Sequence, residues 1–197
     1  MRAAVAKSIN AAAARDLAAA QEVFREEEQI DAEEVQIERE AINLLALHQP
    51  AGSDLRTVFA IVKVNADLER IADCAVNIAQ QVGSLAADGV ELARDVRIMA
   101  EAVLKQLDET LRALESKDAT VAEQVVRSDD LLDALYNQLL QELQTEMAAD
   151  ASKVRGHLAM IMMARNFERI GDHCTNIAED VLYRMMGKIV RHTHDPR

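Results

Sequence analysis

Hydrophobic residues recur at spacings of three and four along most of the chain, which is the period of an amphipathic α-helix. Leu68, Ile71 and Ala75, for example, fall on one face of a helix. Short stretches rich in polar residues, glycine or proline interrupt this pattern and end helices, most clearly at Gln49-Pro50-Ala51-Gly52-Ser53. The pattern predicts six helices, at residues 1–14, 17–48, 54–82, 91–115, 120–147 and 153–186.

The sequence contains an internal repeat. The segment 67–79 returns at 166–178, with Glu, Asp and Asn at matching positions 99 residues apart, and the helices at 17–48 and 120–147 match at an offset of 102. A repeat of about half the chain length indicates a duplicated unit. The sequence therefore predicts an all-α fold, with six helices in two tandem antiparallel three-helix bundles. We expect a first unit with a short first helix, a second unit and a flexible tail, at 1–86, 87–190 and 191–197.

Composition and charge fit this architecture and disfavour some functions. Hydrophobic residues make up 50% of the chain but aromatic residues only 3%, and 6 glycines and 2 prolines are too few for many short strands. The net charge of −12 would repel a nucleic-acid backbone, so we expect no nucleic-acid partner. No run of about 18 apolar residues is present, and we expect a cytoplasmic protein. Cys74 and Cys174 occupy non-equivalent positions in the repeats and fit small core residues.

Acidic residues four positions apart form the candidate site of the chain. Like charges at this spacing destabilise a helix slightly, yet four such pairs recur at equivalent places in the two repeats, two in each. They are Glu27 with Asp31, Glu69 with Asp73, Asp129 with Asp133, and Glu168 with Asp172. If neighbouring helices pack with these flanks together, four carboxylates converge in each bundle, and a metal ion would help to keep them ionised. A solvated acidic face is the simpler alternative.

Oxygen ligands of this kind suit Mg, Ca, Mn or iron, and zinc is also compatible. Asn77 and Asn176 could orient the ligands through hydrogen bonds. His173 is either a surface residue or a further ligand. Arg70 and Arg169 are either ion-pair partners of nearby carboxylates or contacts for an anion or a partner protein. The Glu-x-x-His pairs of di-iron bundles are absent from the sequence, which disfavours a catalytic di-iron site.

The sequence resembles the PhoU family, as two PhoU repeats that span nearly the whole chain. The resemblance rests on Glu69-Arg70-Ile71-Ala72-Asp73, on Glu168-Arg169-Ile170-Gly171-Asp172 and on the other acidic pairs. It implies a twin-bundle protein whose acidic motifs hold multinuclear iron or zinc clusters at the surface. It also implies a homodimer in contact with a phosphate ABC transporter and a membrane sensor histidine kinase, which keeps phosphate-starvation genes silent when phosphate is plentiful. Since the first helix is shorter here than in the family, we expect either an upstream start or an incompletely covered first bundle.

We therefore expect a metal-binding, non-enzymatic regulator of phosphate uptake and phosphate-starvation signalling. The sequence offers no constellation of nucleophile, base and orienting residue, and an acidic surface suits the basic cytoplasmic loops of membrane proteins. A metal-dependent enzyme acting on phosphate-containing substrates is the first alternative, and it would lose turnover when Asp73 or Asp172 becomes Ala. A structural helical adaptor without metal is the second, and it would bind no cation.

Overall fold

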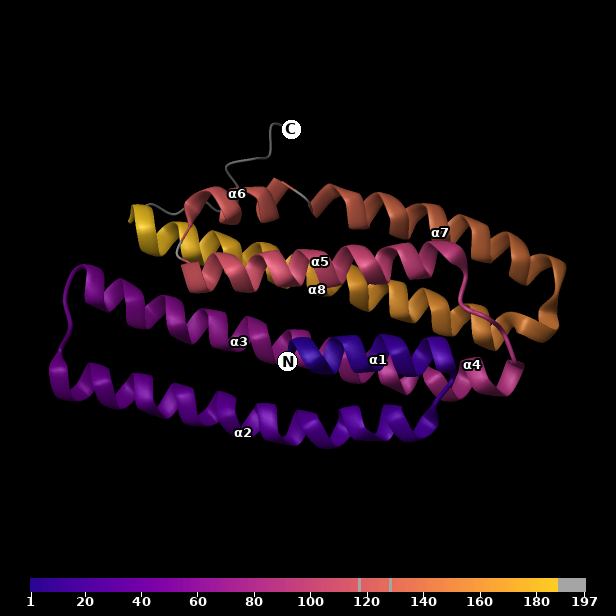
Figure 1. Ribbon diagram of the computed structural model, residues 1–197, viewed down its shortest axis with the longest axis horizontal. Coiled ribbons are helices and arrows are strands. Elements are labelled where there is room, and N and C mark those ends of the chain that lie inside the picture. The colour runs from indigo at the N-terminus through magenta and orange to yellow at the C-terminus, as the bar shows by residue number, and fades with distance from the viewer. Residues whose placement is uncertain (117, 128, 188–197) are drawn as a thin grey trace.

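The computed structural model describes residues 1–116, 118–127 and 129–187, and only the backbone of residues 129 and 130. In these ranges the chain is almost entirely helical and contains no strand (Figure 1), and no helix is both long and apolar enough to cross a membrane. The helices are α1 (Arg2–Ala14), α2 (Leu17–His48), α3 (Ser53–Gln80), α4 (Val82–Asp88), α5 (Arg94–Ser116), α6 (Ala119–Arg127), α7 (Asp129–Ala149) and α8 (Val154–Met186), with a 3-10 turn, η1 (Ala151–Lys153), before α8.

The all-α fold and the six predicted helices are confirmed, with two changes. The predicted end of the third helix at residue 82 is wrong, because the helical course resumes there as α4. Val82 and Leu85 of α4 are completely buried in the core, and this packing outweighs the low helix propensity of the intervening Gly83. The fifth predicted helix, 120–147, is described in two parts, α6 and α7, on either side of residue 128.

The long helices form two groups (Figure 1). α1, α2 and α3 pack on one another, as do α5, α8 and the α6–α7 pair. In Figure 1, α2 lies along the lower edge and α6–α7 along the upper edge, while α3 and α8 run antiparallel between them and make the most extensive contact among the described helices. The expected unit boundary at residue 86 falls inside α4, so the division into two units stays a proposal. The tail at 191–197 lies outside the described residues.

The local sequence explains where α2 begins and ends. The carboxylate of Asp16 accepts hydrogen bonds from the N–H groups of Ala18 and Ala19, at 2.9 and 3.1 Å, and so caps the first turn. The helix ends at His48, its C-cap Gln49 adopts a left-handed φ of 45°, and the next residue is a proline. Gly52 supplies a φ of 59°, a conformation that glycine adopts without strain. The predicted turn is therefore confirmed.

The internal repeat extends to α1 and the second half of α5. At an offset of 102, buried residues of α1 match buried residues of α5, namely Val5 with Leu107, Ser8 with Thr110 and Ala11 with Ala113. Each of the two hydroxyls donates to a backbone carbonyl of the preceding turn, at 2.8 Å. α1 therefore corresponds to residues 104–116 of α5.

Polar contacts fix the register of α3 against α8. Oδ1 of Asp67 lies 2.8 Å from Nδ1 of His173 and accepts a hydrogen bond from Nδ2 of Asn176 at 3.4 Å. Lys63 forms an ion pair with Asp180, whose side chain is only 2% exposed. Because a buried charge is costly without an opposite charge beside it, the ion pair holds the two helices at this register.

We expect Lys63→Met to destabilise the protein by about 2 kcal/mol, because Asp180 then keeps its burial but loses the ammonium group. The figure is below that for a fully buried pair, since the Lys63 side chain is 25% exposed. Urea unfolding followed by circular dichroism measures the effect. The matched control is Lys105→Met, which removes a lysine that is 78% exposed and should cost less than about 0.5 kcal/mol. Equal losses in the two variants would contradict the assignment.

Candidate functional site

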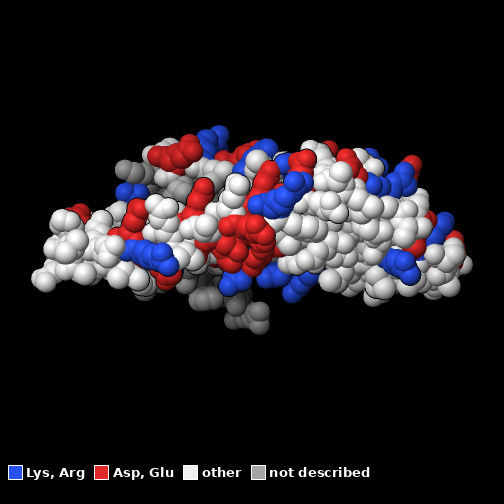
Figure 2. All heavy atoms as spheres, turned by 90° about the horizontal axis from the view of Figure 1, so that it is seen from below, with Lys and Arg blue, Asp and Glu red and all other residues white. Residues whose placement is uncertain are grey.

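Four acidic side chains of α2 and α3 form what we call the first cluster: Glu27, Asp31, Glu69 and Asp73. Burial raises the pKa of Glu27 above its ordinary value, and the carboxylates of Asp31 and Asp73 raise it further. Burial also raises the pKa of Glu69, and Asp73 and Asp31 add to the effect. The repulsion crosses between the two helices in both cases, so the structure brings these side chains near one another. Figure 2 shows Asp and Glu gathered in the middle of the face seen from the α2 side.

Arg70 is the counter-ion of the first cluster. Its Nη1 donates to Oδ2 of Asp73 at 2.8 Å, and its Nε lies 3.3 Å from Oε2 of Glu69. The negative charge of Glu69, together with Asp73, raises the pKa of Arg70. Arg70 in turn offsets part of the rise in the pKa of Glu69. For Arg70, the interpretation as an ion-pair partner is therefore confirmed.

The second half brings together Asp133 of α7 with Glu168 and Asp172 of α8, and we call these three residues the second cluster. Lost hydration raises the pKa of Asp172, and the charges of Glu168 and Asp133 raise it further. Arg165 is the counter-ion here, with Nη1 at 2.8 Å from Oε1 and 2.7 Å from Oε2 of Glu168. The side chain of Asp129, the expected fourth member, lies outside the described residues.

Both clusters offer carboxylate oxygens, the donors that hard divalent cations prefer. Within the described part of the chain, however, no three His, Cys, Asp or Glu side chains are close enough together to hold a metal ion in the conformation seen. Arg70 and Arg165 instead draw the carboxylates of Glu69, Asp73 and Glu168 into ion pairs. A cation at either cluster would compete with these arginines for the carboxylates.

The contact between α3 and α8 contains polar residues that the acidic repeat did not indicate. His173 is half-buried and bound to Asp67, which the sequence had not singled out. Asn176, which we expected to orient a metal ligand, donates to the same carboxylate. Asp67 corresponds to Asn166 in the second repeat, so the duplication carried no signal for this contact. Which polar residues meet across two helices depends on the faces that pack together, and the spacing within one helix does not specify that.

Cys74 and Cys174 are reduced and completely buried, which confirms their prediction as core residues. Burial raises the pKa of Cys74 to about 11, and its thiol therefore stays protonated at neutral pH. The thiols of Cys74 and Cys174 are thus enclosed and cannot serve as nucleophiles at the surface clusters.

We expect Glu27→Gln to stabilise the metal-free protein by about 0.5 kcal/mol at pH 7.5, because it removes repulsion from Asp31 and Asp73. The raised pKa of Glu27 means that the folded protein takes up this proton more readily than the unfolded chain. The wild type therefore regains stability as the pH falls through the folded-state pKa, and the advantage of the variant should vanish near the ordinary value of 4.5. Urea unfolding in the presence of a chelator measures the stability difference at pH 7.5 and its change with pH. The control is Glu38→Gln at an exposed position of α2. A variant less stable than the wild type at pH 7.5 would contradict the repulsion.

Comparison with known proteins agrees with this architecture. The family model for the PhoU domain matches residues 1–82 and 96–181. The phosphate-specific transport system accessory protein PhoU homolog of Rhizobium meliloti is 38% identical over 185 residues, which are 93% of this chain and 78% of that protein. The protein of the same name from Aquifex aeolicus is 34% identical over 192 residues, which are 97% of this chain and 87% of that protein.

Two solved structures have the same fold. The crystal structure of PhoU from Pseudomonas aeruginosa matches with a TM-score of 0.91 and 37% identity, over 95% of this chain and 90% of that one. The phosphate transport system regulatory protein PhoU from Streptococcus pneumoniae matches with a TM-score of 0.88 and 26% identity, over 96% of this chain and 89% of that one. The resemblance seen in the sequence is confirmed, and the chain belongs to the PhoU family.

Proposed function

We propose that this chain is an accessory regulator of a phosphate-specific transport system. Family membership carries the proposal, because the relatives from Rhizobium meliloti and Aquifex aeolicus are named as accessory proteins of such a system. The Streptococcus pneumoniae structure is likewise named as a regulatory protein of phosphate transport. The likeness covers both halves of the fold, so the proposed role belongs to the twin bundle as a whole.

In this role the chain acts by binding other molecules and not by catalysis. Its surface clusters consist of carboxylates paired with arginines, which recognise charge but supply no strong nucleophile. The two thiols are enclosed in the core. The imidazole of His173 is engaged by Asp67 between α3 and α8. These groups support a regulator that changes its contacts when its charge changes.

Binding of cations at the two clusters is part of the proposal. The raised pKa values of Glu27, Glu69 and Asp172 support it: burial and repulsion both disfavour the charged carboxylates, and a cation would offset both effects. Glu27, Asp31, Glu69 and Asp73 would hold metal in the first half, and Asp129, Asp133, Glu168 and Asp172 in the second. The family resemblance favours iron or zinc in multinuclear clusters, and oxygen donors also admit Mn, Mg or Ca.

The partners follow from the same role. We propose a cytoplasmic homodimer that contacts a phosphate ABC transporter and a sensor histidine kinase and restrains phosphate-starvation signalling. The acidic surface supports contact with the cytoplasmic sides of membrane proteins, because their short cytoplasmic loops carry an excess of Lys and Arg. Since the net charge is −12, such contacts should weaken as the salt concentration rises.

Complementation tests the regulatory role. In a bacterial strain that lacks its own PhoU protein, expression of this chain should lower phosphate uptake and silence a phosphate-starvation promoter in phosphate-rich medium. Radiolabelled phosphate and a promoter reporter measure the two effects. A chain that is expressed and folded in that strain but changes neither readout would contradict the proposal. Turnover of phosphate compounds by the purified protein, lost in Asp73→Ala and Asp172→Ala, would support an enzyme instead.

We expect Arg70→Gln to bind Mn²⁺ or Zn²⁺ about fivefold more tightly than the wild type, because a cation no longer competes with the guanidinium for Glu69 and Asp73. Isothermal titration of metal-free protein measures the affinity, and elemental analysis measures the stoichiometry. The matched control is Arg127→Gln, since Arg127 pairs with Glu123 at 3.6 Å and belongs to neither cluster. Unchanged affinity in Arg70→Gln, or no binding by any variant, would contradict metal binding at the first cluster.

A further inference from the structure

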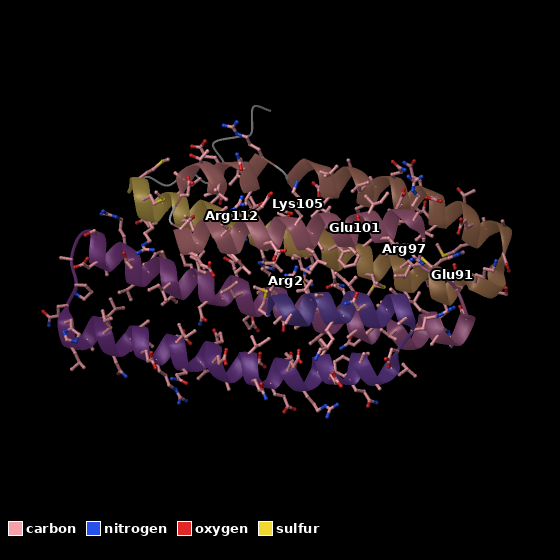
Figure 3. The ribbon with its side chains drawn as sticks, in the orientation of Figure 1. Arg2, Glu91, Arg97, Glu101, Lys105 and Arg112 are labelled. Carbon is pink, nitrogen blue, oxygen red and sulfur yellow. The ribbon has the colours of Figure 1, made fainter. Side chains whose placement is uncertain are left out.

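A pocket lies in the second half of the molecule, where the chain passes from α4 into α5. Its volume is about 430 Å³. Its walls come from the segment between α4 and α5, from the last turns of α7 and from the start of α8. In Figure 3 the labelled Glu91 marks this end of α5. Small-molecule sites commonly have volumes in this range.

The segment between α4 and α5 is held in place by neighbouring elements. The N–H of Gly156 donates to Oδ2 of Asp88 at 2.9 Å, and Nη1 of Arg15 donates to the carbonyl oxygen of Gly89 at 2.9 Å. The side chain of Val90 packs beside Gly156, where an added Cβ would lie only 2.8 Å from it. This wall of the pocket is therefore formed before any ligand binds.

A buried histidine positions one acidic side chain of the pocket. The side chain of His157 is 4% exposed, and its Nε2 lies 3.1 Å from Oε2 of Glu146. Because a carboxylate accepts hydrogen bonds, the neutral imidazole donates through Nε2 and keeps a lone pair on Nδ1. Nδ1 is buried and has no hydrogen-bond partner among the described residues. A buried acceptor costs stability unless a donor reaches it.

The repeat shows that the fold does not require this polar pair. At offsets of 99 and 102, His157 corresponds to Val58 and Glu146 corresponds to Leu44. Val58 is buried, so an apolar side chain suffices at this position of the first half. The second half therefore contains a histidine–carboxylate pair that packing alone does not explain.

Three carboxylates line the pocket: Glu91 from the segment before α5, and Glu142 and Glu146 from α7. The two on α7 are four residues apart and therefore project from the same face of the helix. Among the described residues, no basic side chain forms an ion pair with Glu91 or Glu142. His157 engages only one oxygen of Glu146. The lining therefore offers several hydrogen-bond acceptors that lack a donor.

Two basic residues of the lining offset only part of this negative charge. Nζ of Lys153 lies 3.3 Å from Oδ2 of Asp150, so its charge is already paired. Arg94 is exposed and pairs with no carboxylate among the described residues. The three carboxylates thus outnumber the one guanidinium that remains to balance them. The lining also has an apolar part, which consists of Val90, Ala93 and Met160.

We propose that the pocket binds an alkylguanidinium group, with the cation between the carboxylates of Glu142 and Glu146 and the aliphatic stem against Met160. A guanidinium presents several N–H donors in a planar fork that suits carboxylates, and it is weakly hydrated. Its stem packs on apolar surface as the stem of an arginine does. Such a group belongs either to a free small molecule or to an arginine of a partner protein. The inference goes beyond the proposed regulatory role, because the pocket shares no residue with the acidic clusters.

Titration of the full chain with butylguanidinium tests the pocket, in the presence of a chelator and with NMR chemical shifts as the readout. We expect saturable binding, and at least tenfold weaker binding of pentanoate, which has a similar stem and the opposite charge. A short peptide with one arginine between uncharged residues separates the two sources. Tighter binding of the peptide than of butylguanidinium assigns the pocket to a partner protein, and weaker binding assigns it to a small molecule.

Matched variants locate the binding site. Glu142→Gln and Glu146→Gln should each weaken binding of butylguanidinium at least fivefold, because each removes a carboxylate and keeps the shape of the side chain. Arg94→Gln should strengthen binding about threefold, since the competing cation is lost. The control is Glu101→Gln, which removes an exposed carboxylate of α5 outside the pocket (Figure 3). Its affinity should stay within about twofold of the wild type, and circular dichroism confirms that each variant is folded.

Three outcomes would overturn the inference. The first is no saturable binding of butylguanidinium, and the second is equal binding of butylguanidinium and pentanoate. The third is an equal loss of affinity in Glu101→Gln and Glu146→Gln, since net charge and not the pocket would then govern binding. None of these results bears on regulation of phosphate transport, which the complementation assay tests separately.

Discussion

The antiparallel contact between α3 and α8 is the constraint on which the rest of the molecule depends. The pairs Lys63 with Asp180 and Asp67 with Asn176 set a register in which position 72 faces position 171. These positions are Ala72 and Gly171, and both are buried. Small side chains at this level leave room for the two helices to approach closely.

This register also explains why acidic residues lie where they do. In each repeat, the Glu and Asp of the motif lie within a few residues of the small residue at the crossing, so they lie at the middle of the molecule and not at its ends. The outer helix of the same half packs against the flank that carries them: α2 packs on α3, and α7 packs on α8. Packing of the outer helices then buries these acids and brings acids from two helices together, and both effects raise the pKa of Glu27 and Asp172.

Most of the fold was predictable because it follows from local periodicity and from a repeat with a constant offset. Spacing within one helix showed which faces are apolar, and the offset of 99 alone pairs Glu69 with Glu168. The extension of α4 was missed because burial of Leu85 outweighs the propensity of Gly83. The counter-ions were predictable only in part: Arg70 follows its glutamate in sequence, whereas Arg165 reaches Glu168 from the preceding turn.

The sequence did not predict contacts that depend on which helix faces pack together. Lys63 and Asp180 are far apart in the chain and neither belongs to the duplicated motif, so nothing in the spacing links them. The different exposure of Ile61 and Met160 was equally hidden, because the two occupy equivalent positions and look alike as hydrophobic residues. Their difference in exposure depends on whether a third helix extends over them.

The arginines beside the acidic clusters have a consequence for how the protein holds together when no cation is bound there. Small zinc domains unfold when a chelator removes the metal, because nothing else neutralises or links their ligands. Here Arg70 and Arg165 supply positive charge beside the carboxylates. The helices themselves are held together by a hydrophobic core. The architecture therefore does not depend on a cation at the clusters, and the cation binding proposed above would change the surface charge without unfolding the bundle.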